Sequence, residues 1–135
     1  MMIGVLLAAG ASTRMGRAKA LAKTGSESFV AHGIRNLWCA CDTVVVVLGA
    51  DAARIRKRTE EEFVRQVETG CFERELCSAR RHRAQKLEVR FAVNRAWKKG
   101  MYSSVRAGLA AAARLGAAAR GGTPRGSSGR RGSRR

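Results

Sequence analysis

Two cations in a loop of small residues near the start of the chain favour phosphate chemistry. Arg14 and Lys19 stand in a stretch, residues 8–21, that is otherwise rich in Ala, Gly and Ser. Small residues let backbone N–H groups approach a ligand closely, and a turn of such groups forms a nest for anions. Arg can clamp a phosphate with two hydrogen bonds, and Lys adds a point charge. The loop therefore has the parts to hold a triphosphate and to stabilise charge during phosphoryl or nucleotidyl transfer.

The spacing within the loop excludes two familiar phosphate motifs. Gly10 is followed by Gly16 and then by Arg17, whereas a Walker A loop has Lys after its second glycine. The dinucleotide pattern G-x-G-x-x-G does not occur there either. From the residues alone, a Gly/Ala turn with solvated cations is an equal alternative to a phosphate site.

Three apolar runs predict the strands that would position this loop. They cover residues 3–7, 43–48 and 88–93. The first two are continuous rather than alternating, which is typical of parallel strands buried on both faces. Helical segments lie between the runs, so the order predicts an α/β fold with three layers and a mostly parallel sheet. Ligands of such sheets bind beyond the carboxyl ends of the strands, where the small-residue loop begins.

Capping residues and apolar spacing place the helices. Ser28 is expected to cap the first helix, Asp51 the second, and Ser103 or Ser104 the third. The spacing of apolar residues predicts which side chains of the third helix point inward. These are Val105, Leu109 and Ala112.

Composition divides the chain into a folded part and a tail. We expect one domain over residues 1–115, with residues 68–87 as an insertion because they are polar and aperiodic. Residues 116–135 consist almost entirely of Ala, Gly, Arg and Ser, so we expect a disordered tail. Its composition is also typical of a shifted GC-rich reading frame, and we keep this as a hypothesis.

Charge and cysteine usage narrow the class of protein. Lys and Arg number 27 against 10 for Asp and Glu, a formal net charge of +17. No apolar run approaches the roughly 20 residues of a membrane span. The apolar stretch 1–11 has no basic residue before it, which is not typical of an export signal. The spacing of the four cysteines fits neither zinc nor a disulfide scaffold, so we expect a cytoplasmic protein with reduced thiols. They are Cys39, Cys41, Cys71 and Cys77.

Two motifs resemble those of the MobA-like nucleotidyltransferases, the group that includes molybdenum cofactor cytidylyltransferases. The pattern L-A-A-G-x-S-x-R-M-G-x-x-K-x-L begins at Leu7, and N-x-x-W-x-x-G-M-x-S-S-x-x-x-G-L begins at Asn94. The resemblance covers roughly residues 3–115, with 68–87 outside it. It implies a nucleotide-diphospho-sugar transferase-like domain that is incomplete at its C-terminus.

The resemblance also implies a reaction and a set of site residues. An NTP, with CTP favoured over GTP, would give its NMP to a phosphorylated acceptor of the molybdopterin type, with pyrophosphate release and Mg²⁺ on the phosphates. Arg14 and Lys19 would be catalytic, since they would hold the triphosphate and neutralise the departing pyrophosphate. The expected nucleotide-binding residues are Leu7, Ala8, Ala9, Gly10, Ser12, Arg14, Lys19, Asn94, Gly100 and Ser103.

The chain departs from the family after its third helix. The family has a metal-binding Asp in a D-x-P context beyond that helix, whereas this sequence has no acid after Glu88. No protein ligand for Mg²⁺ is therefore identified, and loss of catalytic activity in this chain stays an open alternative. We also expect that the loss of later strands leaves Val44–Val47 partly exposed and the chain prone to aggregate.

Two other functions stay open. One is a non-catalytic remnant that binds nucleotide. The other is a basic protein that binds nucleic acid through its Arg/Gly tail, because such tails bind single-stranded RNA by charge and guanidinium stacking.

Overall fold

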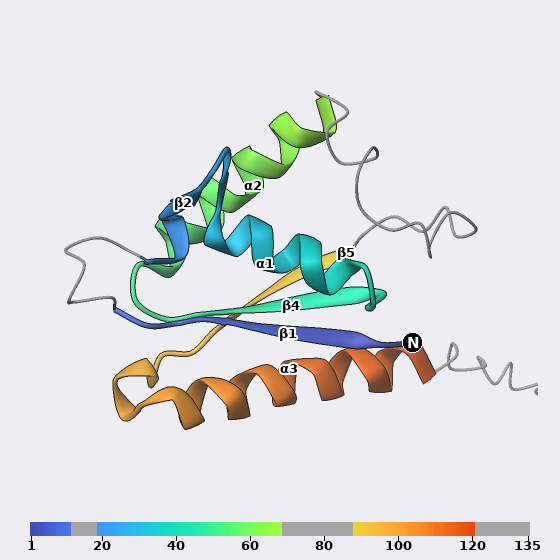
Figure 1. Ribbon diagram of the computed structural model, residues 1–135. Coiled ribbons are helices and arrows are strands. Elements are labelled where there is room, and N and C mark those ends of the chain that lie inside the picture. The colour runs from blue at the N-terminus through green and yellow to red at the C-terminus, as the bar shows by residue number, and fades with distance from the viewer. Residues whose placement is uncertain (12–18, 69–87, 121–135) are drawn as a thin grey trace, which may run out of the picture.

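A computed structural model describes residues 1–11, 19–68 and 88–120 (Figure 1). The strands are β1 (Ile3–Ala8), β2 (Lys23–Thr24), β3 (Glu27–Ser28), β4 (Thr43–Leu48) and β5 (Glu88–Val93). The helices are α1 (Phe29–Trp38), α2 (Ala52–Glu68) and α3 (Met101–Arg120). Two short 3₁₀ turns complete the order, η2 (Lys19–Leu21) and η4 (Trp97–Lys99). Within these described ranges, no helix is both long and apolar enough to cross a membrane.

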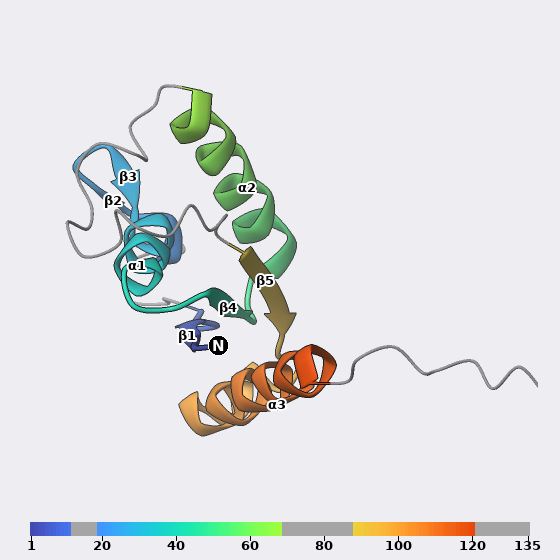
Figure 2. The ribbon, with the colours of Figure 1, turned by 90° about the vertical axis from the view of Figure 1, so that its right-hand side faces the viewer.

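The main sheet has the order β1-β4-β5, and all three strands are parallel. Val45 of β4 lies opposite Val5 on one side and Arg90 on the other. Helices α1 and α2 cover one face of this sheet, and α3 covers the opposite face (Figures 1 and 2). The α/β fold with three layers and a parallel sheet is therefore confirmed.

Strand β4 is the centre of the core, and the expectation that Val44–Val47 would be partly exposed is wrong. Each of these four valines, and Leu48 after them, has 0% of its surface exposed. The crossovers through α1 and α2 place β1 and β5 on the two edges of β4, and helices cover both of its faces. Among the described strands, the outer edges of the sheet belong instead to β1 and β5.

The short hairpin β2–β3 was not expected from the sequence, and it anchors the start of α1. Ser28 caps α1 as predicted, because its Oγ accepts a hydrogen bond of 3.2 Å from Ala31 N. The neighbouring Glu27 is buried, and its Oε1 contacts Arg35 and, at 2.9 Å, Nδ1 of His32. The backbone N–H of Ser28 donates to Glu62 Oε1 of α2 at 2.8 Å. These bonds fix the hairpin to both helices of this layer.

Helix α3 differs from its expected start, inward face and end. It begins at Met101, so Ser103 and Ser104 lie inside its first turn instead of capping it. Leu109 is 60% exposed, and the prediction that it points inward is wrong. The close approach to the sheet is made by Gly108, where an added Cβ would lie 2.5 Å from Val5 Cγ1.

The end of α3 also corrects the expected start of the tail. Residues 116–120 are helical, although we expected disorder from residue 116. Alanine has the highest helix propensity, and residues 117–119 are all alanines, so the helix continues to Arg120. The rest of the expected tail and most of the expected insertion, 69–87, lie outside the described residues.

Candidate functional site

The segments that follow β1, β4 and β5 meet at the carboxyl edge of the sheet, and Gly49 is their junction. A Cβ on Gly49 would lie 2.6 Å from the carbonyl oxygen of Ala9 and 2.6 Å from Cβ of Trp97. Ala50 N also donates to the Ala9 carbonyl at 3.3 Å. A glycine is needed here because a backbone oxygen of one loop and the Cβ of a residue in another loop crowd this position. The three loops therefore form one continuous surface, which contains Ala9, Gly49 and Trp97 and is called the floor of the site.

A cavity of about 370 Å³ opens beside the end of β1. Four of the residues expected to bind nucleotide line it, namely Leu7, Ala8, Gly10 and Lys19. The other lining residues are Leu6, Ala20, Phe29 and Val30. A concave, mostly apolar space with a single charged group is typical of small-molecule sites, and this volume lies in their lower range.

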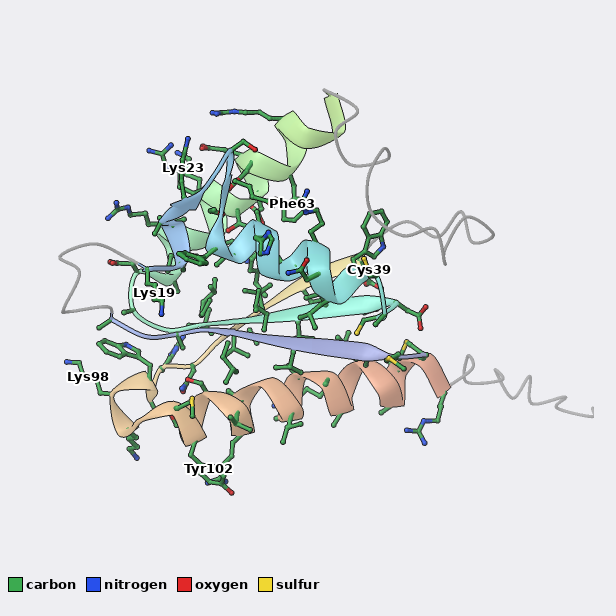
Figure 3. All side chains as sticks on the ribbon, in the orientation of Figure 1. Lys19, Lys23, Cys39, Phe63, Lys98 and Tyr102 are labelled. Carbon is green, nitrogen blue, oxygen red and sulfur yellow. The ribbon has the colours of Figure 1, made fainter. Side chains whose placement is uncertain are left out.

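Lys19 reaches this cavity because the hairpin holds the short η2 turn against α1. Ala22 N donates to the Lys19 carbonyl at 3.0 Å, and Phe29 N donates to the Ala22 carbonyl at 3.0 Å. The side chain of Lys19 is exposed at the carboxyl end of the strands (Figure 3). An ammonium group there supplies positive charge next to the backbone of residues 8–10.

Asn94 forms the centre of a hydrogen-bond network in the loop after β5. Its Nδ2 donates to Ser103 Oγ at 2.8 Å and to Ser104 Oγ at 3.0 Å. Its Oδ1 accepts from Ala96 N at 3.0 Å. The Asn94 side chain is buried and uses all of these groups inside the protein. Its bonds shape the turn after β5, and that Asn94 also binds nucleotide stays a prediction.

Gly100 ends this turn in a conformation that favours glycine, with φ 99°. The hydroxyl of Ser103 lies 2.7 Å from the Gly100 carbonyl oxygen and 3.0 Å from that of Ala96, so it can donate to either. Ser103 therefore joins the Asn94 network to the start of α3. Gly100 and Ser103, both expected at the nucleotide, are placed near the same edge of the sheet as Gly10.

Asp51 stands at this edge as well, and it follows β4 with φ 54°, an uncommon conformation for a residue other than glycine. It is the one acid in the sequence segments 9–26, 49–54 and 94–135. Mg²⁺ prefers several oxygen ligands in octahedral geometry. The described ranges hold no group of three His, Cys, Asp or Glu side chains that could form a metal cage.

The structure places some of the expected site residues and not others. Ser12 and Arg14 lie outside the described residues, so the geometry of Arg14 is not part of the site described above. Ala9 is buried with 6% exposure, and its carbonyl oxygen accepts from Ala50 N. Gly49 and Trp97 were not predicted as site residues, although a glycine directly after a buried strand was a signal for the first.

The cysteines in the described residues lie apart from this edge. Cys39 and Cys41 are free thiols between α1 and β4, where β4 begins. Cys71 and Cys77 lie outside the described residues. The two described thiols therefore contribute nothing to the chemistry of the candidate site.

One comparison with known proteins found a match. The family model of the MobA-like NTP transferase domain matches residues 4–119, which include the three loops that meet at Gly49. No curated protein and no solved structure showed a significant match.

Proposed function

The chain belongs to the MobA-like NTP transferase domain family, a family of nucleotidyltransferases, and we propose that it transfers CMP from CTP to a small phosphorylated acceptor of the molybdopterin type. The family inferred from the two motifs is confirmed by this match. CTP rather than GTP, and the molybdopterin-type acceptor, follow from the resemblance of the two motifs to the cytidylyltransferases. We also propose that the protein works in the cytoplasm, where the free thiols of Cys39 and Cys41 would stay reduced.

The observation that carries the proposal is the cavity at the end of β1. It gathers Leu7, Ala8, Gly10 and Lys19, which the sequence motif had named independently of any geometry. The space can receive part of a nucleotide, while its phosphates extend over the backbone of residues 8–10. Small residues there let N–H groups face the phosphate oxygens.

Lys19 has the role of charge stabilisation. When an acceptor phosphate oxygen bonds to the α-phosphorus, the bond from that phosphorus to the bridging oxygen of the β-phosphate breaks. Pyrophosphate then leaves with the electron pair and gains negative charge. An ammonium fixed beside the phosphates stabilises that charge more in the transition state than in the ground state. We propose that Arg14 adds a second cation to the same phosphates.

Mg²⁺ enters this proposal as part of the substrate. The described residues offer no cage for the ion, and the acid nearest in sequence to this edge is Asp51. Mg²⁺ commonly binds through substrate phosphates with few protein ligands. No step is therefore assigned to a metal held by the protein.

Calorimetric titration of CTP with Mg²⁺ tests the binding part of the proposal. We expect Lys19→Ala and Arg14→Ala each to weaken CTP binding by about tenfold to a hundredfold, because each removes a charge-assisted hydrogen bond. Lys57→Ala is the matched control, since it removes an exposed lysine from α2. Equal affinity of Lys19→Ala and the control would contradict the proposal.

Release of pyrophosphate from CTP in the presence of molybdopterin tests the transfer itself. Release shows an active enzyme, whereas CTP binding without release supports the non-catalytic remnant. The nucleic-acid alternative predicts RNA affinity that falls when residues 121–135 are deleted and that ignores Lys19→Ala. This deletion leaves α3 intact, since the helix ends at Arg120.

A further inference from the structure

We infer that the turn after β5 is a second anion site, which holds the phosphate of the acceptor through Arg95, Lys98 and Lys99. The inference rests on the proposed function, since an acceptor is needed only if the nucleotidyl group is transferred. The turn consists of residues 95–100, between Asn94 and the start of α3.

The turn of residues 95–100, called the platform below, has a backbone that hydrogen bonds hold in place. Asn94 holds it from below through three hydrogen bonds of 2.8–3.0 Å to Ala96, Ser103 and Ser104. Within the turn, Lys99 N donates to the Ala96 carbonyl at 2.9 Å and Gly100 N donates to the Trp97 carbonyl at 3.2 Å. A backbone that is already fixed loses little entropy when a ligand binds, so only the cationic side chains have to order around it.

Trp97 packs the platform against the sheet. Its side chain packs with the core cluster that contains Ala9, Val45 and Val47. A Cβ added to Gly49 would lie 2.6 Å from Cβ of Trp97, which shows how closely the turn meets the loop after β4. The ammonium of Lys98 lies 5.6 Å from the Trp97 ring centroid, a cation–π distance.

No carboxylate among the described residues compensates the charge of the platform. The side chains of Arg95, Lys98 and Lys99 are exposed, and none forms an ion pair with a carboxylate of the described residues. No acidic residue occurs in the sequence after Glu88, so the segment that carries the platform has no acid of its own. Clustered cations without countercharge raise the local concentration of anions.

The platform faces the same edge of the sheet as the cavity. Figure 3 shows Lys19 and Lys98 at the same end of the molecule, with the carboxyl ends of β1 and β4 between them. A nucleotide in the cavity and an acceptor on the platform would therefore approach each other across the floor at Gly49. The α-phosphorus would lie between two separate groups of cations.

The chemistry of the transfer favours a phosphate monoester on the platform. Such a monoester is largely a dianion near neutral pH, because its second pKa is about 6. It needs no base to become a nucleophile, and two or three cations can hold its other oxygens. A nucleic-acid strand would instead stack successive bases on a series of exposed aromatic rings, whereas next to the turn Trp97 is partly buried and Tyr102 is a single ring, 74% exposed.

Amide chemical shifts of the full chain, measured by NMR, test this inference. Glycerol 2-phosphate serves as the phosphate monoester, glycerol as its uncharged counterpart, and CTP as the nucleotide. We expect glycerol 2-phosphate, and not glycerol, to shift the amides of residues 95–101. We expect the triple variant R95Q/K98Q/K99Q to weaken this binding by about tenfold, since each charged contact contributes a few-fold.

A charge-matched control variant distinguishes a specific anion site from the general attraction of anions to a basic protein. R54Q/K57Q/R58Q removes three exposed cations from α2 and lowers the net charge by the same amount. Equal weakening by both triple variants, or unshifted amides at 95–101, would overturn the inference. So would binding of a short single-stranded RNA that depends on residues 95, 98 and 99 while glycerol 2-phosphate does not bind.

The CTP titration keeps this test separate from that of the proposed function. If CTP fails to shift the amides of residues 8–10, the proposed function fails whatever the phosphate monoester does. If CTP binds equally well to wild type and R95Q/K98Q/K99Q while the monoester loses affinity, the two sites are distinct.

Discussion

Gly49→Ala is the substitution that most directly tests how the site is assembled. The new methyl group would lie 2.6 Å from the Ala9 carbonyl oxygen and 2.6 Å from Cβ of Trp97, whereas ordinary contact begins near 3.4 Å. At least one neighbour must therefore move by about 0.8 Å. The two clashing groups belong to different loops, so relief on one side does not relieve the other.

The expected cost comes from overpacking, which is typically about 1–3 kcal/mol. We expect a value near the upper end, because one clashing atom is a backbone oxygen that also accepts from Ala50 N at 3.3 Å. With a denaturant slope of about 1–3 kcal/mol per molar urea, the unfolding midpoint should fall by about 1–3 M. CTP affinity should fall as well, because residues 8–10 are displaced.

Urea unfolding followed by circular dichroism measures the effect, and calorimetry with CTP measures its consequence for binding. Gly116→Ala is the control, since an added Cβ meets only Arg120 Nη2 at 3.9 Å. That substitution should stabilise α3 by about 0.5–1 kcal/mol, because alanine has the higher helix propensity. An unchanged midpoint and unchanged CTP affinity for Gly49→Ala would refute the assembly of the site around this glycine.

Substitutions at four further residues test the packing that supports the site, each measured by urea unfolding. Gly108→Ala should lower the free energy of unfolding by about 1–3 kcal/mol, because its Cβ would lie 2.5 Å from a valine of β1. Leu109→Ala should lower it by less than about 0.5 kcal/mol, because that side chain is 60% exposed. A larger loss for Leu109→Ala than for Gly108→Ala would show that α3 is rotated. Glu27→Gln should cost about 1–3 kcal/mol, since it leaves the partly buried Arg35 without its carboxylate, and an equal loss in high salt is expected because the contact is sheltered. Ser28→Ala should cost about 1 kcal/mol by removing the cap of α1, and Ser28→Asp should recover most of it; failure of Asp to do so would mean that the hydroxyl contributes through another contact.

Local patterns in the sequence predicted the main elements well. The continuous apolar runs mark β1, β4 and β5 because strands buried on both faces need no polar alternation. Ser28 predicted the start of α1 since its hydroxyl competes for a free helical N–H. The same reasoning failed at α3, where the hydroxyls of Ser103 and Ser104 bond to the side chain of Asn94, ten or fewer residues away, and do not cap the helix.

The sequence by itself predicted phosphate chemistry at the end of β1, because small residues and a lysine after a strand can face an anion, and this role of Lys19 stays a prediction. It also determined the fold class, since the periodicity of apolar residues is a local property. Only the tertiary structure decided that the central strand β4 is fully buried, that Gly108 and not Leu109 meets the sheet, and that Gly49 joins the three loops. These outcomes depend on which surfaces approach across long separations in sequence, and no local pattern encodes those distances.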